Sequence, residues 1–313
     1  MGIDTAHYHG WQGTRRTPWL AALAIVRVDM LQVFRRRVYW LVLSLGLLHF
    51  LLFFALIYAV TQLPLPDQSR RQVLEKLGFA PAAAAVDIGP AGDAATELRS
   101  QATGENGYIE FMNNQSIIVM LRLAFSGSLL VGSDYQGGAL PFYLSRRIDR
   151  LHYIFGKLLA VATLIWIVTV LPALGLFVEY GLFTTSADYW IDNLTIVGGV
   201  LGYGLVSGFA LSLTLVTLSS YLVRTAPIAI VWSSAFVLLA GLSNLLSEAT
   251  GNRYWKLLSF WRDVRYTGQM AFDYFGGRSP NALAWPAFWI VCGVCVVMWL
   301  ALLRRVRAVE VVT

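Results

Sequence analysis

Residues 39–60 read YWLVLSLGLLHFLLFFALIYAV, an apolar stretch without a charged side chain, and residues 35–37 before it are three consecutive arginines. A helix needs about 20 apolar residues to cross the hydrocarbon core of a bilayer, at about 1.5 Å per residue. The stretch is too long for the apolar part of a cleavable signal peptide, and no small-residue cleavage site follows it. It therefore predicts a retained membrane-spanning helix, and the arginines place the N-terminus in the cytoplasm.

Further stretches of the chain meet the same test of length and apolar character. They are residues 115–131, 154–178, 194–223, 226–246 and 285–303. Backbone groups in lipid must form hydrogen bonds within their own segment, so each stretch is predicted to be a helix. We expect an all-α integral membrane protein with six transmembrane helices within residues 39–303.

The composition agrees with this class. Hydrophobic residues make up 57% of the 313-residue chain, charged residues 13%, and the mean hydropathy is +0.60. A chain with so few polar groups cannot cover its apolar surface in water, which argues against a soluble enzyme, a nucleic-acid reader and a disordered regulator. We attribute the net charge of +6 to cytoplasmic loops beside anionic lipid, with no nucleic acid as partner.

The distribution of basic residues predicts the topology. Basic residues between spans two and three, between spans four and five and after span six are Arg146, Arg147, Arg150, Lys157, Arg224, Arg304, Arg305 and Arg307. An even number of spans then places both termini in the cytoplasm, the C-terminal one as the tail 304–313. The expected location is a bacterial inner membrane.

The predicted outer loops are residues 61–114 and 247–284. The first carries seven acidic and four basic residues, as expected for the outer side. The second is an exception because it is basic, and its many aromatic residues predict short helices lying at the membrane interface.

The cytoplasmic N-terminal segment, residues 1–38, contains an amphipathic pattern. Apolar side chains recur at helical spacing at Leu20, Leu23, Ala24, Val28, Leu31 and Phe34, with Arg27, Arg35 and Arg37 among them. The pattern predicts a helix over residues 19–38 that lies on the cytoplasmic surface of the membrane. A plain extension of span one is the alternative.

Residues suited to catalysis or to holding a cofactor are scarce. The sequence has no P-loop, and only His49 among its four histidines lies in a predicted span, which argues against a two-histidine haem site. Cys292 and Cys295 share a helix face, but without acidic or histidine neighbours they are interpreted as small apolar packing residues. We therefore predict no catalytic, cofactor-binding or metal-binding residue, and no enzyme activity on this chain.

Arg122 is the one charge deep within a predicted span. Burial of an arginine at the centre of a membrane helix costs about 2.5–3.5 kcal/mol on insertion scales, so the side chain needs a partner or a water-filled cavity. Two interpretations are open. Arg122 is a pathway residue that contacts an anionic substrate group, or it is structural, paired with a neighbour such as Glu110 or extended towards the nearer surface.

The segment 132–153 between spans two and three resembles the signature of ABC-2-type exporter permeases. The matching residues are Asp134, Gly138, Leu140, Leu144, Ser145, Ile148, Arg150, Gly156 and Lys157. The chain departs from the signature at Ala139, Arg147 and Asp149. Residues 26–40, with acidic Asp29, are similar to the helix that precedes span one in that family.

This resemblance implies a dimer of six-helix subunits with a substrate pathway between them. The second subunit is another copy or a related permease, and separate P-loop ATPase subunits, which bind ATP and Mg²⁺, dock from the cytoplasm. The residues implied to contact the ATPase are Arg35, Arg36, Arg37, Leu144, Ser145, Arg146, Arg147 and Arg150.

The expected function is therefore that of the transmembrane subunit of an ABC exporter with an unidentified substrate. The alternative is a membrane anchor or scaffold subunit of a larger complex. A proton-coupled carrier is disfavoured because no acidic residue lies deep in a predicted span.

Overall fold

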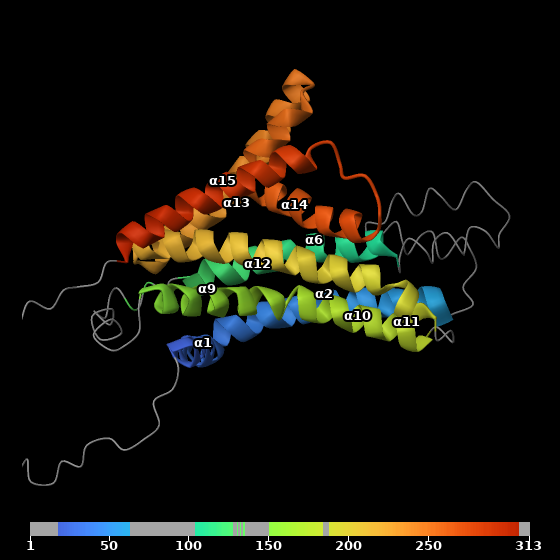
Figure 1. The fold of residues 1–313 in the computed structure, drawn as a ribbon, viewed down its shortest axis with the longest axis horizontal. Helices are drawn as coiled ribbons and strands as arrows, with labels where there is room; N and C mark the ends of the chain where they lie inside the picture. Colours follow the sequence, from blue (N-terminus) through green and yellow to red (C-terminus); the bar gives the residue numbers. More distant parts are fainter. Residues whose placement is uncertain are drawn as a thin grey trace, which may run out of the picture.

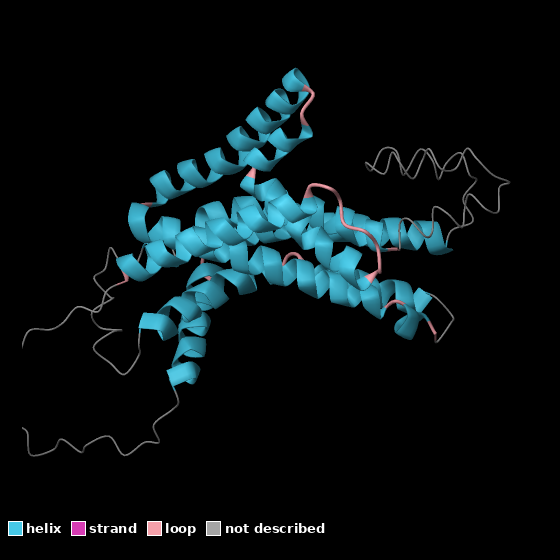
Figure 2. Cartoon of the chain, turned by 45° about the horizontal axis from the view of Figure 1, so that its top comes forward, coloured by secondary structure: helices cyan, strands magenta, loops and turns pink. Residues whose placement is uncertain are grey.

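A computed structural model of the chain describes residues 18–62, 104–127, 130, 132, 134, 150–183 and 188–306. Within these residues all regular structure is helical (Figures 1 and 2). The helices are α1 (Pro18–Phe34), α2 (Arg37–Gln62), α6 (Glu105–Gly127), α9 (Arg150–Trp166), α10 (Val170–Phe183), α11 (Tyr189–Asp192), α12 (Leu194–Leu222), α13 (Thr225–Thr250), η3 (Arg253–Leu258), α14 (Phe260–Phe275) and α15 (Ala284–Arg305).

Five helical segments are long and apolar enough to cross a membrane. They are Arg37–Ala55, Arg150–Phe183, Tyr189–Leu222, Thr225–Thr250 and Ala284–Arg305. The expectation of an all-helical protein with several helices able to span a membrane is thus confirmed for the described residues. The predicted span 115–131 falls on α6, which is not among the five and carries Glu105, Glu110 and Arg122.

Helix α12 is the centre of the bundle. It lies between α9–α10 on one side and α14–α15 on the other (Figure 1). Glycines on α12 make this close packing possible: a Cβ atom at Gly199 would overlap the ring of Phe272 on α14, and one at Gly208 would lie 2.6 Å from Trp166 Nε1 on α9.

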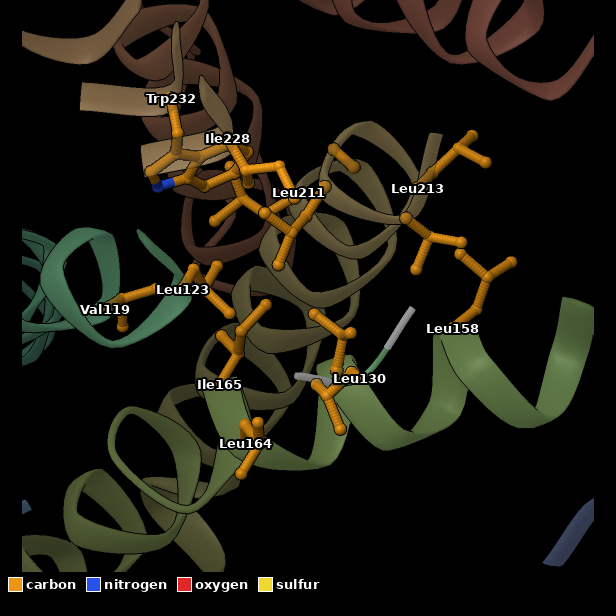
Figure 3. Packing of buried hydrophobic residues seen from close by; sticks show 14 of the residues in the cluster. Val119, Leu123, Leu130, Leu158, Leu164, Ile165, Leu211, Leu213, Ile228 and Trp232 are labelled. Carbon is orange, nitrogen blue, oxygen red and sulfur yellow. The ribbon is translucent and has the colours of Figure 1, made fainter. Parts of the chain in front are cut away.

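One buried apolar cluster joins α6, α9, α12 and α13. Figure 3 shows part of it, with Val119 and Leu123 from α6, Leu158, Leu164 and Ile165 from α9, Leu211 and Leu213 from α12, and Ile228 and Trp232 from α13. The indole Nε1 of Trp232 donates a hydrogen bond to the carbonyl of Met120 at 3.2 Å. These contacts hold α6 inside the bundle although it is more polar than α9, α12 and α13.

The predicted span 154–178 is interrupted at residues 167–169, between α9 and α10. Pro172 explains the break. Its nitrogen has no hydrogen to donate to the carbonyl four residues earlier, and its ring crowds that carbonyl. The hydroxyl of Thr169 donates to the Ile165 carbonyl at 2.9 Å, and the same carbonyl accepts the backbone N–H groups of Val168 and Thr169.

Helix α14 differs from the expected short helix at the interface. It is amphipathic, but one face is buried against α12 and α15, with Asp263, Val264, Thr267, Gly268 and Phe272 inside. The glycines of α12 admit this face, and Gly268 faces Tyr203 of α12 in return. The aromatic residues Tyr254, Trp255, Tyr274 and Phe275 stay exposed.

Replacement of Gly199 by alanine should destabilise the fold, because its methyl group would overlap the ring of fully buried Phe272. Overpacking of this kind costs about 1–3 kcal/mol. Gly241 of α13 provides the control, since a Cβ there meets no atom within 4 Å. Thermal unfolding in detergent should show a lower midpoint for Gly199→Ala and no decrease for Gly241→Ala. Equal midpoints for the two variants would contradict the packing of α12 on α14.

Candidate functional site

Helix α1 packs closely on α9 near one end of the bundle (Figure 1). Gly156 on α9 makes the approach possible: a Cβ atom there would lie 3.2 Å from the carbonyl oxygen of Ala22 and 3.2 Å from Cβ of Ile25. The next residue along α9 is Lys157. Close helix approach therefore brings the lysine side chain directly against α1.

Lys157 is the centre of a buried charged cluster. Its ammonium group donates a hydrogen bond to Asp29 Oδ1 of α1 at 2.8 Å and lies 2.8 Å from Asp134 Oδ2. A third hydrogen bond goes to the Leu130 carbonyl at 2.5 Å. The three donors of the ammonium group are thus all engaged, and the lysine links α1, α9 and the chain that follows α6.

The cluster is shielded from solvent. Lys157 is 1% exposed, Asp29 3% and Asp134 9%. Asp134 also accepts a hydrogen bond from the hydroxyl of Tyr153 at 2.9 Å, whereas Asp29 Oδ2 has no partner among the described residues. Two carboxylates around one ammonium give a net charge of −1 when both are ionised, and burial makes that charge costly.

Burial raises the pKa of the Asp29 carboxyl from 3.8 to about 6, against the opposing attraction of Lys157. Protonation of Asp29 removes the excess negative charge and leaves the pair of Lys157 and Asp134. The cluster therefore contributes most to the stability of the fold when Asp29 carries a proton.

Stability should depend on pH through this carboxyl. The folded protein holds the Asp29 proton more tightly than the unfolded chain does, so the contribution is fully present below pH 3.8 and is lost as the pH rises through about 6. Between pH 5 and pH 8 the loss is about 1.4 kcal/mol. Unfolding midpoints of the wild type and Asp29→Asn at both pH values measure it, since the other titrating groups are common to both proteins. Parallel changes in the two proteins would contradict the assignment.

The structure describes only part of the predicted ATPase-docking set. Arg35, Arg36 and Arg37 are exposed at the junction of α1 and α2, and Arg150 is exposed at the start of α9. The junction of α1 and α2 and the start of α9 lie towards the same end of the bundle (Figure 1). Leu144, Ser145, Arg146 and Arg147 lie outside the described residues.

Arg122 is buried, with 2% of its surface exposed. Its guanidinium carbon lies 4.4 Å from the centroid of the Tyr39 ring. The proposed pairing with Glu110 is wrong, because Glu110 is exposed and lies twelve residues away, about 18 Å along the same helix. Extension to the surface is also wrong for a side chain buried to this degree.

His49, Cys292 and Cys295 are the remaining residues that were considered for binding a cofactor or a metal. His49 packs among aromatic rings: its ring is stacked on Phe111 at 5.3 Å between centroids, and its centroid lies 4.9 Å from that of Phe53. Cys292 and Cys295 are free thiols in α15. The described part of the chain contains no group of three or more acidic, histidine or cysteine residues placed to hold a metal.

Sequence reasoning did not identify the charged cluster as a site. Asp29, Asp134 and Lys157 were recognised separately, as members of segments that resemble the permease family. The available signal is that all three are charged residues in or near predicted apolar helices: Asp29 within 19–38, Asp134 just after 115–131 and Lys157 at the start of 154–178. Comparisons of the chain with protein-family models, curated proteins and solved structures find no match.

Proposed function

We propose that the chain is the transmembrane permease subunit of an ATP-driven exporter. It would move an unidentified substrate by means of ATP hydrolysed on a separate P-loop ATPase, without covalent chemistry of its own. One observation carries the proposal. The three charged residues that mark the segments resembling ABC-2-type permeases, Asp29, Asp134 and Lys157, meet in a single buried cluster.

Such a cluster suits a subunit driven from the cytoplasm. It joins α1 and α9 to the start of the segment 132–153, which carries the predicted docking residues. A displacement of this segment by the ATPase would therefore be transmitted to α1, to α9 and to the chain that follows α6 at the same time. The shift of the bundle between inward-facing and outward-facing states would follow from that movement.

Six membrane crossings are the arrangement that fits the charges best. Helix α6 has 23 residues, about 35 Å in length, which is enough to cross the hydrocarbon core. Its contacts with α2, α12 and α13 let its polar side chains face protein. With α6 as the sixth crossing, the arginines before α2 and at the end of α15 lie on one side, the cytoplasm.

Helix α1 has the character of an interfacial helix. The side chains of Leu20, Leu23, Val28 and Leu31 are exposed, whereas Ala22, Ile25, Asp29 and Val33 are buried towards the bundle. Exposed leucines on this surface favour contact with the lipid interface. The proposed assembly contains two such permease subunits, two ATPase subunits and the bilayer.

Purification from native membranes tests the proposal. An exporter subunit should bring down a P-loop ATPase in a fixed ratio, and the complex should hydrolyse ATP faster in lipid than in detergent. A scaffold subunit should bring down other partners and leave the activity of any such ATPase unchanged. The second result would overturn the proposal.

A further inference from the structure

A pocket of about 320 Å³ lies where the junction of α1 and α2 meets α6 and the start of α13. Arg36, Tyr39, Arg122, Ser126 and Thr225 give the pocket its polar wall. All five side chains carry hydrogen-bond donors, and the lining contains no carboxylate. The pocket is therefore suited to an anion.

Three of these side chains are buried without a hydrogen-bond partner among the described residues. They are Arg122, at all three guanidinium nitrogens, Tyr39, at its hydroxyl, and Ser126, at its hydroxyl. Arg122 and Ser126 are each 2% exposed. The face of the Tyr39 ring attracts the arginine cation but accepts none of its in-plane N–H groups. Buried polar groups are satisfied in most proteins, so an unsatisfied set around one pocket points to a missing ligand.

The remaining wall of the pocket is apolar. Val33 and Val42 are buried, whereas Val38 and Phe125 are about half exposed, at 52% and 49%, on the outside of the bundle. The pocket thus combines a cationic interior with an apolar surface beside it. A ligand that fits both parts has an anionic group joined to a hydrocarbon chain.

The position of the pocket agrees with a membrane lipid. Arg122 lies five residues before the end of α6, about 8 Å along its axis, and Arg36 lies between α1 and α2. With α6 in the bilayer, the exposed Arg36 places the opening of the pocket near the headgroups on the side of the arginine clusters, and Arg122 lies in its buried interior. Arginine binds the planar face of a phosphate with paired hydrogen bonds.

We propose that this pocket binds the phosphate group of an anionic bilayer lipid, with Arg122 as its principal ligand and Tyr39, Ser126 and Arg36 completing the site. The acyl chains lie against Val38 and Phe125. The proposal shares with the proposed function only the placement of α6 in the bilayer. Transport and ATP hydrolysis do not enter its test.

Native mass spectrometry of the purified full chain provides that test, with phosphatidylglycerol and phosphatidylcholine as probes. We expect phosphatidylglycerol to bind more tightly than phosphatidylcholine, and Arg122→Gln to weaken its binding about tenfold, equivalent to about 1.4 kcal/mol. Tyr39→Phe keeps the ring beneath the guanidinium and should cause a smaller loss, which provides a second variant if Arg122→Gln folds poorly. Arg224→Gln is the control, because Arg224 is exposed beside Thr225 but does not line the pocket.

Competition by inorganic phosphate separates a lipid headgroup from a soluble phosphate. The lipid assignment predicts no displacement of phosphatidylglycerol by millimolar inorganic phosphate. Displacement would overturn that assignment in favour of a soluble phosphate ligand. Binding that is unchanged in both Arg122→Gln and Tyr39→Phe, or that falls equally in Arg224→Gln, would overturn the site itself.

Discussion

Replacement of Lys157 by methionine should lower the free energy of unfolding by about 3–5 kcal/mol, the usual cost of removing one partner from a buried ion pair. Methionine fills a similar volume but leaves Asp29 and Asp134 as buried carboxylates without a cation. The carbonyl of Leu130 also loses its donor. Detergent-solubilised Lys157→Met should therefore unfold or aggregate at a clearly lower temperature than the wild type.

Two further variants isolate the charge effect. The triple variant Asp29→Asn, Asp134→Asn, Lys157→Met removes all three charges and should recover most of the lost stability, since a neutral cluster carries no unpaired charge. Lys256→Met, in η3, changes a partly exposed lysine with no ion pair in the described part of the chain and should behave as the wild type. Failure of the triple variant to recover would mean that Lys157 acts by shape rather than by charge.

Reversal of Arg146, Arg147 and Arg150 to glutamate should abolish coupling to the ATPase while the helices stay folded. The reversal places negative charges against the ATPase groups that the arginines are proposed to contact. Unfavourable charge pairs at an interface cost several kcal/mol, so the affinity for the ATPase should fall by at least about a hundredfold. Arg150 begins α9, where a glutamate interacts favourably with the helix dipole, so the helix start is preserved. ATP hydrolysis and substrate transport by the reconstituted complex measure the effect.

Reversal of Arg253 and Lys256 to glutamate is the matched control. Both residues lie in η3, between α13 and α14, far along the chain from the proposed docking segment. This control should assemble with the ATPase and transport normally. A normal rate of transport in the triple reversal would instead show that the segment 132–153 is not the docking element.

The sequence predicts the membrane-spanning helices well because hydropathy alone decides them. Spans at 39–60, 194–223, 226–246 and 285–303 correspond to α2, α12, α13 and α15. Helix α6 is less easily assigned, since its polar side chains are matched by neighbours that the sequence does not reveal. Its start at Glu105, ten residues before the predicted one, reflects a polar first turn that hydropathy does not count.

Pro172 and the glycines of α12 are evident in the sequence, but their effects on the structure are not. Pro172 lies within the predicted span 154–178, and its missing N–H accounts for the break between α9 and α10. The glycines of α12 lie within the predicted span 194–223, but only the structure shows that they admit Phe272 and the rest of α14. The buried face of α14 follows from that contact.

Long-range pairing could not be predicted at all. Asp29 and Lys157 are 128 positions apart, and no local pattern joins them. Arg122 presented the opposite difficulty: its burial was expected, but its surroundings were not. A pair with Glu110 was one of the interpretations left open, and the structure instead shows the ring of Tyr39 and a pocket lined by donors around Arg122.

The most direct test of the proposed exporter subunit is site-specific photo-crosslinking in native membranes, with a photoreactive amino acid in place of Ser145. We expect a covalent adduct between this position and a P-loop ATPase, formed from the cytoplasmic side. An adduct with lipid or another membrane protein only, or reaction with a reagent confined to the outer side, would contradict it.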